Sequence, residues 1–108
     1  MYDKFQKAGN THREDGPALI LYDRDGDKVY QSYYIDGKLH RDSGPSHTKY
    51  RWDLSVWIEE YHIEGKLHRE DGPAFIEYEK DGTLKKQSYF INGIPNHEEY
   101  PYKWLTKS

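Results

Sequence analysis

The chain has 108 residues, of which 34% are hydrophobic and 32% are charged, and its formal net charge is -3 at pH 7. It contains no cysteine, which excludes disulfides, thiolate zinc sites and a cysteine nucleophile. Lysines and arginines are scattered without a basic run, so the composition argues against nucleic acid as a main partner. Aromatic residues make up 16% of the chain, which disfavours disorder, and we expect a single domain over residues 1–108.

One sequence motif recurs along the chain at a constant spacing. HREDGPA begins at His12 and again at His68, and an altered copy, HRDSGPS, begins at His40, so neighbouring copies lie 28 residues apart (40 minus 12, and 68 minus 40). Other residues follow the same step, namely Gly9, Gly37, Gly65 and Gly93; Pro17, Pro45, Pro73 and Pro101; and Phe5, Tyr33, Tyr61 and Tyr89. A fixed period of this length is the signature of a repeat architecture. We expect an N-terminal cap over 1–11, repeats over about 12–39, 40–67 and 68–95, and a C-terminal cap over 96–108.

In chain order, each repeat contains two extended runs separated by turns. The first run ends in DRDG at Asp23–Gly26 and in EKDG at Glu79–Gly82, which are hairpin signals. The second run ends in Asp-Gly, Glu-Gly or Asn-Gly, pairs that supply the positive φ that tight turns need. No stretch shows the 3.6-residue apolar period of a helix. We therefore predict an all-β array of antiparallel β-hairpins with a 28-residue period.

The unit Y-x-I-x-G-K-L-H-R-x-D-G-P-A resembles a known class of repeats. It is similar to divergent MORN-type repeats (membrane occupation and recognition nexus), and more similar to the H-R-x-D-G-P-A repeat proteins of bacteriophages and large DNA viruses. The resemblance covers roughly residues 5–93. It implies an open, curved, MORN-like sheet with a binding role and no shared catalytic apparatus. It also implies a viral accessory protein that acts on a host component, such as a bacterial defence system.

The HREDGPA motif has two interpretations at the level of sequence. In the first, the histidine and acids of each copy, as in His12, Glu14 and Asp15, form a cluster for metal binding or acid–base chemistry. In the second, Asp-Gly-Pro sets a turn, and the His and Arg side chains form structural ladders in which Arg pairs with the acids. An enzyme needs one site of unique geometry, whereas a scaffold needs the motif in every unit. We favour the structural interpretation and expect no catalytic residue, no metal and no cofactor.

The middle hairpin departs from its neighbours. Leu54 stands where the other two turns carry glycine, and Trp52 stands where they carry a charged residue. Two Trp and an Arg near one hairpin tip fit a protein-interaction hot spot, since these residue types dominate interface energetics. The alternative is that Trp57 covers the sheet and Trp52 packs on the neighbouring hairpin. The candidate partner-binding residues are His47, Lys49, Arg51, Trp52, Trp57, His62 and Trp104.

These features predict a non-enzymatic protein-binding module that binds and inhibits or modulates a host protein. A small-ligand or nucleotide-binding sponge is the alternative, and an enzyme that uses the His-Arg-acid clusters comes last. The edge strands of an open array, or the C-terminal cap, favour a homodimer. No apolar run approaches membrane-spanning length, so we expect no membrane insertion and a cytoplasmic location, which is the host cytoplasm if the protein is viral.

Overall fold

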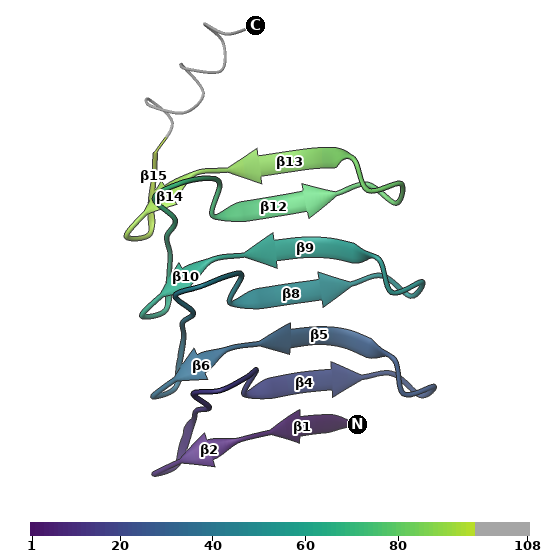
Figure 1. Cartoon of the computed structure of the whole chain (residues 1–108), viewed down its shortest axis with the longest axis vertical. Helices are drawn as coiled ribbons and strands as arrows, with labels where there is room; N and C mark the ends of the chain where they lie inside the picture. Colours follow the sequence, from purple (N-terminus) through teal and green to yellow (C-terminus); the bar gives the residue numbers. More distant parts are fainter. Residues whose placement is uncertain (97–108) are drawn as a thin grey trace, which may run out of the picture.

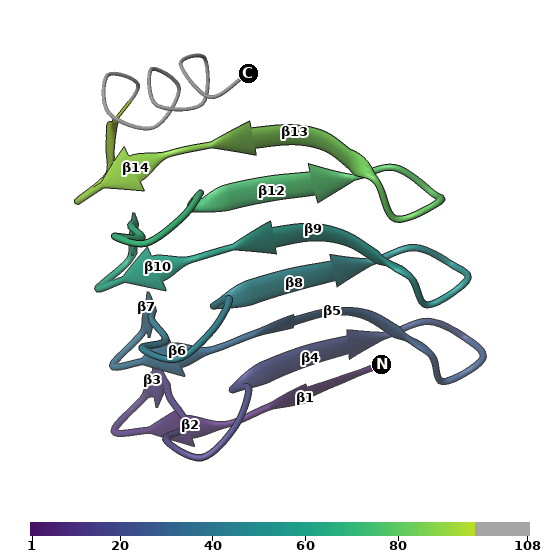
Figure 2. The ribbon, with the colours of Figure 1, turned by 45° about the horizontal axis from the view of Figure 1, so that its top comes forward.

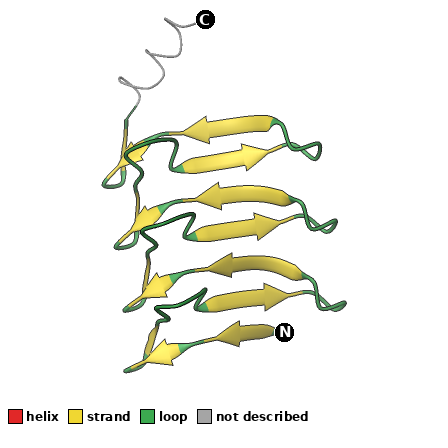
Figure 3. Ribbon diagram, viewed as in Figure 1, coloured by secondary structure: helices red, strands yellow, loops and turns green. Residues whose placement is uncertain are grey.

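The computed structural model describes residues 1–96, and within this range the chain forms strands, turns and loops without a helix (Figure 3). The prediction of an all-β, antiparallel architecture is therefore confirmed. The C-terminal cap expected over 96–108 lies, apart from Asn96, outside the described residues. No segment of residues 1–96 forms a helix long and apolar enough to cross a membrane.

A seven-stranded antiparallel sheet forms the body of the molecule (Figure 1). Its strands, in spatial order, are β1 (Tyr2–Lys4), β4 (Leu19–Tyr22), β5 (Lys28–Ser32), β8 (His47–Tyr50), β9 (Val56–Glu60), β12 (Phe75–Tyr78) and β13 (Leu84–Ser88). Spatial order follows chain order, so β4–β5, β8–β9 and β12–β13 are hairpins laid side by side. Within the described residues, β1 and β13 each pair on one side only and are the edges of the sheet.

Four two-stranded sheets stack along one side of the main sheet (Figure 2). They are β2 (Gln6–Lys7) with β3 (Asn10–Thr11), β6 (Tyr34–Ile35) with β7 (Lys38–Leu39), β10 (His62–Ile63) with β11 (Lys66–Leu67), and β14 (Phe90–Ile91) with β15 (Ile94–Pro95). Each turn uses two residues of positive φ, as at Asp36 (51°) and Gly37 (80°). The Asp-Gly type pairs therefore form the turns that the sequence predicts.

The second extended run of each unit is split into a long strand and a short strand, where the sequence predicts one run. At Tyr33 the backbone N–H donates to Ser46 O (2.7 Å), which belongs to the following unit. At Tyr34 the carbonyl accepts from Arg13 N (3.1 Å), which lies in the motif loop of the same unit. The ladder changes partner between these two residues, so the short strand leaves the main sheet and stacks on the small sheet before it.

The three hairpins share one register and one irregularity. Leu19 pairs with Ser32, His47 with Glu60 and Phe75 with Ser88, and each hairpin has a bulge near its turn end. A bulge adds a residue to one strand and increases the local twist. The buried apolar residues are few, namely Ala18, Ile20, Ala74, Ile76 and Tyr89. The core is a thin ladder, and the repeated packing of neighbouring strands takes the place of a large enclosed interior.

Candidate functional site

The histidines of the three motif loops join each loop to the turn that follows it. The Nδ1 atoms of His12, His40 and His68 accept hydrogen bonds from the backbone N–H groups of Asp36 (3.0 Å), Glu64 (3.0 Å) and Asn92 (2.9 Å). The acceptor role of Nδ1 places the proton of the neutral ring on Nε2. That nitrogen faces an acid of its own loop, as in the 3.1 Å contact from His12 to Glu14. The bond with His12 lowers the pKa of the Glu14 carboxyl, and the charge of Lys7 adds to this.

The arginines of the motif loops stack on the aromatic residue that joins a long strand to the short strand after it. The guanidinium carbons of Arg13, Arg41 and Arg69 lie 4.1, 3.9 and 4.0 Å from the ring centres of Phe5, Tyr33 and Tyr61. Each arginine also donates Nη1 to the carbonyl of the motif proline, at 3.2 to 3.3 Å. The motif glycine leaves room for this approach, because a Cβ on Gly44 would lie 3.0 Å from Arg41 Nη1.

The pairing of Arg with the acids, as the structural interpretation expects, occurs in the outer copies. Arg13 Nε donates to Asp15 (3.0 Å), and Arg69 Nε donates to Asp71 (3.2 Å). Ser43 stands at this position in the middle copy, and Arg41 keeps its stacking and its proline contact. Among residues 1–96, no three His, Asp or Glu side chains converge as a metal site would require. The motif contacts thus give His and Arg an architectural role.

The turns of the three main hairpins have the same backbone but different side chains. In the middle turn, Arg51 N donates to Ser55 O and Leu54 N donates to Arg51 O, both at 2.9 Å. The same pair of bonds closes the turns at 23–27 and 79–83. The fourth residue has positive φ in each turn: 85° at Gly26, 74° at Leu54 and 90° at Gly82. Leucine in this left-handed region is strained, because its Cβ crowds the following carbonyl.

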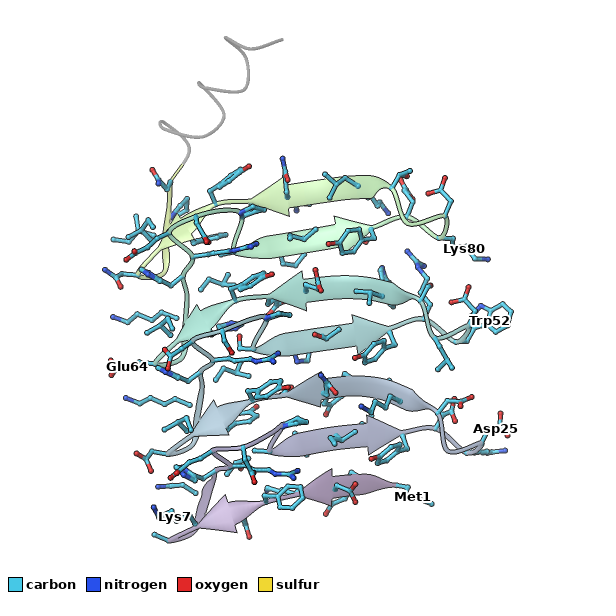
Figure 4. All side chains as sticks on the ribbon, viewed as in Figure 1. Met1, Lys7, Asp25, Trp52, Glu64 and Lys80 are labelled. Atoms are coloured by element: carbon cyan, nitrogen blue, oxygen red, sulfur yellow. The ribbon has the colours of Figure 1, made fainter. Side chains whose placement is uncertain are left out.

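The tip of the middle hairpin exposes two large apolar side chains. Trp52 is 80% exposed and Leu54 is 53% exposed. Figure 4 shows Trp52 on one margin of the molecule, between Asp25 and Lys80 at the tips of the neighbouring hairpins. Lys80 Nζ lies 5.9 Å from the Trp52 ring centre. Trp52 therefore lies beside Lys80 of the next hairpin and leaves most of its ring in solvent.

The other candidate residues of the middle hairpin pack within the sheet. Lys49 Nζ and the Arg51 guanidinium carbon lie 4.6 and 5.0 Å from the Trp57 ring centre. Trp57 donates Nε1 to Glu77 Oε2 on β12 (3.2 Å). Arg51 donates Nη2 to Tyr78 O on the same strand (2.7 Å). These contacts hold the middle hairpin against the third hairpin, so Trp57 covers the sheet as the alternative interpretation expects.

His47 and His62 lie at the other end of the middle hairpin, away from its turn. His62 is 7% exposed, and its Nδ1 lies 2.7 Å from Ser46 Oγ. His47 Nδ1 lies 2.7 Å from Ser32 Oγ, and burial lowers the pKa of its ring. The sequence groups both histidines with Trp52, but the structure places them in a separate polar cluster. Trp104 lies outside the described residues.

The candidate residues predicted from the sequence omit two parts of the site that the structure reveals. Leu54 is visible in the sequence as the replacement of a turn glycine, but its large exposed area becomes clear in the structure. Ser46 stands where the other two motif copies carry alanine, Glu60 belongs to no motif, and the bend of the chain after β9 brings both to His62. No known family model, curated protein or solved structure matches this chain.

Proposed function

We propose that the chain is a MORN-like array of 28-residue repeats that acts as a non-enzymatic protein-binding module. The observation that carries this proposal is the tip of the middle hairpin, where Trp52 and Leu54 are exposed together. Burying such side chains at an interface removes their apolar surface from water, at roughly 25 cal/mol per Å². Trp is also among the residues that dominate binding energy at interfaces.

The backbone of Leu54 supports a binding role over a structural one. The neighbouring turns adopt the same conformation with glycine, so the fold has no need of a side chain at this position. Strain at an exposed residue costs free energy of folding without a packing gain. Backbone strain of this kind clusters at functional sites. We infer that Leu54 is kept for a contact that forms when a partner binds.

The partner that we propose is a host protein, which the phage-type protein binds and inhibits or modulates in the host cytoplasm. The resemblance of the repeat unit to bacteriophage proteins supports this part of the proposal, as an analogy. Lys49, Arg51 and Trp57 would act by holding the hairpin in place, because they contact one another and β12. Trp52 and Leu54 would make the contact itself.

The proposal is tested by affinity capture from bacterial lysate with matched variants. The double variant Trp52→Lys, Leu54→Gly gives the middle turn the residues of the third turn, Lys80 and Gly82. We expect wild type to retain a protein in stoichiometric amount. The double variant should retain at least tenfold less of that protein, since the loss of a hot-spot residue costs 2 kcal/mol or more of binding free energy.

Arg24→Ala is the control, because Arg24 occupies the position of Trp52 in the first turn. The Arg24→Ala protein should capture the same protein in the same amount as wild type. Circular dichroism should show that each variant is folded. Equal capture by wild type and the folded double variant would contradict the assignment of the tip. No capture by wild type would contradict the protein-binding role for that host.

A further inference from the structure

The middle hairpin and the first residue of β10 after it contain four polar residues at positions where the neighbouring hairpins carry apolar, aromatic or small residues. These are Ser46, His47, Glu60 and His62. The corresponding residues are Ala18, Leu19, Ser32 and Tyr34 in the first hairpin, and Ala74, Phe75, Ser88 and Phe90 in the third. Because all three hairpins share one register, the polar set is a property of the middle hairpin alone among the described residues.

Ser46 and His62 are buried, His47 and Glu60 are partly exposed, and hydrogen bonds and short contacts tie the four residues to one another or to the neighbouring hairpin. Ser46 is 0% exposed, and its hydroxyl donates to the backbone carbonyl of Glu60 (3.0 Å). The Ser46 oxygen lies 2.7 Å from His62 Nδ1, and His62 Nε2 lies 3.6 Å from Glu60 Oε1. His47 is tied to the preceding hairpin through Ser32 Oγ, at 2.7 Å. A buried polar network is stable only while each of its members is satisfied.

Both ring nitrogens of His62 face polar groups. Nδ1 lies 2.7 Å from Ser46 Oγ, and Nε2 faces the Glu60 side chain. The neutral ring has one N–H for these two contacts, and protonation adds a second N–H and a positive charge. Burial, with the charge of His47, holds the pKa of His62 at about 4. Burial and Lys49 lower the pKa of His47, and burial raises that of Glu60.

The surroundings of the cluster disfavour added positive charge. The titratable and charged groups on the strands paired around it are Lys28 and Tyr30 on β5, Lys49 and Tyr50 on β8, Glu59 on β9, Lys66 on β11, and Glu77 and Tyr78 on β12. Tyr34 on β6 follows β5, and Arg41 donates its backbone N–H to His62 O. Lys49 already places a cation near His47, and the Tyr30 ring lies 5.4 Å from the His47 ring. Glu77 is engaged with Trp57 and Lys85. Two protonated histidines would repel each other and Lys49, with the Glu60 carboxyl as their neighbouring acid.

We propose that this cluster is a proton-operated latch, which fixes β8, β9 and β10 when its histidines are neutral and releases them when the histidines are protonated. The release is confined to the middle hairpin, because its neighbours carry Leu19 and Phe75 where it carries His47. The latch acts on the hairpin that also bears Trp52, but at the opposite end of its strands. It is a property of the isolated chain and holds whether or not the chain binds a protein.

Amide hydrogen exchange of the ¹⁵N-labelled protein tests the latch, at pH 7 and pH 5 with intrinsic rates corrected. A shift of the His62 pKa from 6.5 to about 4 favours local opening about 20-fold at pH 5 over pH 7, and the raised pKa of Glu60 opposes this in part. We therefore expect the opening equilibrium of the β8–β9 amides to rise about tenfold. Amides bonded within β4–β5 and within β12–β13 should change less than about threefold on the same argument.

The variant Ser46→Ala, His47→Leu, Glu60→Ser, His62→Tyr gives the middle hairpin the residues of the first, and it should abolish the tenfold change. The double variant His47→Gln, His62→Gln keeps both positions polar but cannot be protonated there. It replaces the first variant in the same test if the first variant does not fold. In wild type, the histidine Cε1 shifts report the titration directly. Titration of both histidines near pH 6.5, or equal pH effects in all three hairpins, would overturn the proposal.

Discussion

Leu54 holds a backbone conformation that glycine adopts in both neighbouring turns. Its φ of 74° costs a branched residue about 1–2 kcal/mol relative to an unstrained one. Its side chain is also more than half exposed, so packing within residues 1–96 returns little of that free energy. Trp52, two residues earlier, is 80% exposed, more than Tyr2 or Phe5. Strain and exposure together indicate that Leu54 and Trp52 contribute little to the free energy of folding.

Leu54→Gly should raise the free energy of unfolding by about 0.5–1 kcal/mol. Relief of the left-handed strain exceeds the entropy that glycine adds to the unfolded chain. The midpoint of urea denaturation measures the change. The mirror substitution Gly82→Leu, at the same position of the third turn, should lower stability by a similar amount. A lower midpoint for Leu54→Gly would show that the leucine stabilises the turn, which contradicts the argument for binding.

The sequence predicts the residue types at the site better than their placement. Trp52 stands out because its neighbours at the same turn position are charged, and the structure leaves it exposed. His62 is also among the residues that the sequence predicts to bind a partner, because the sequence does not show what covers a side chain. The bend after β9 buries His62 against Ser46, and that bend depends on a change of hydrogen-bond partner between units. No local pattern reveals such a change.

At the scale of elements, the motif loops link consecutive small sheets. Each motif histidine accepts the N–H of a turn residue 24 positions later, and each motif arginine covers an aromatic ring. Turn chemistry is readable from the Asp-Gly type pairs, and the structure confirms their positive φ. The stacking of Arg41 on Tyr33 is not readable, because the two residues come from different elements and meet through the fold alone.

His68→Ala should lower stability by about 0.5–1.5 kcal/mol, because it removes the hydrogen bond that the Asn92 N–H donates to the ring. The thermal midpoint should fall by several degrees, as expected for a domain of this size. Glu70→Gln is a matched control on the same loop, since Glu70 is 83% exposed at its side chain and its contact with His68 is 3.5 Å. An unchanged midpoint for His68→Ala would contradict the structural role of the motif.

At the scale of the whole molecule, one thin sheet grows by the addition of similar hairpins. In such arrays each unit contacts mainly its neighbours, so stability is close to a sum of unit and interface contributions. If the proposed 28-residue repeat is correct, one unit can be removed without breaking the pattern of the rest. Deletion of residues 40–67, or of residues 12–39, joins the preceding residue to a motif histidine in phase.

Both deletion proteins should fold, with a single cooperative transition at a lower midpoint than wild type. Far-ultraviolet circular dichroism during thermal unfolding measures this. The spectrum should remain that of a β protein, because register and turn chemistry are unchanged in the units that remain. If both deletion proteins were unfolded, the proposed 28-residue repeat would be contradicted, because its units could not be removed one at a time.

The most direct test of the account compares the two deletion proteins as baits in capture from bacterial lysate. They have the same number of units, but deletion of 40–67 removes Trp52 and Leu54, whereas deletion of 12–39 keeps them. We predict that the protein lacking 12–39 retains the partner of the wild type and that the one lacking 40–67 does not. Retention by the protein without 40–67, with loss by the other, would contradict the claim that binding resides in the middle hairpin.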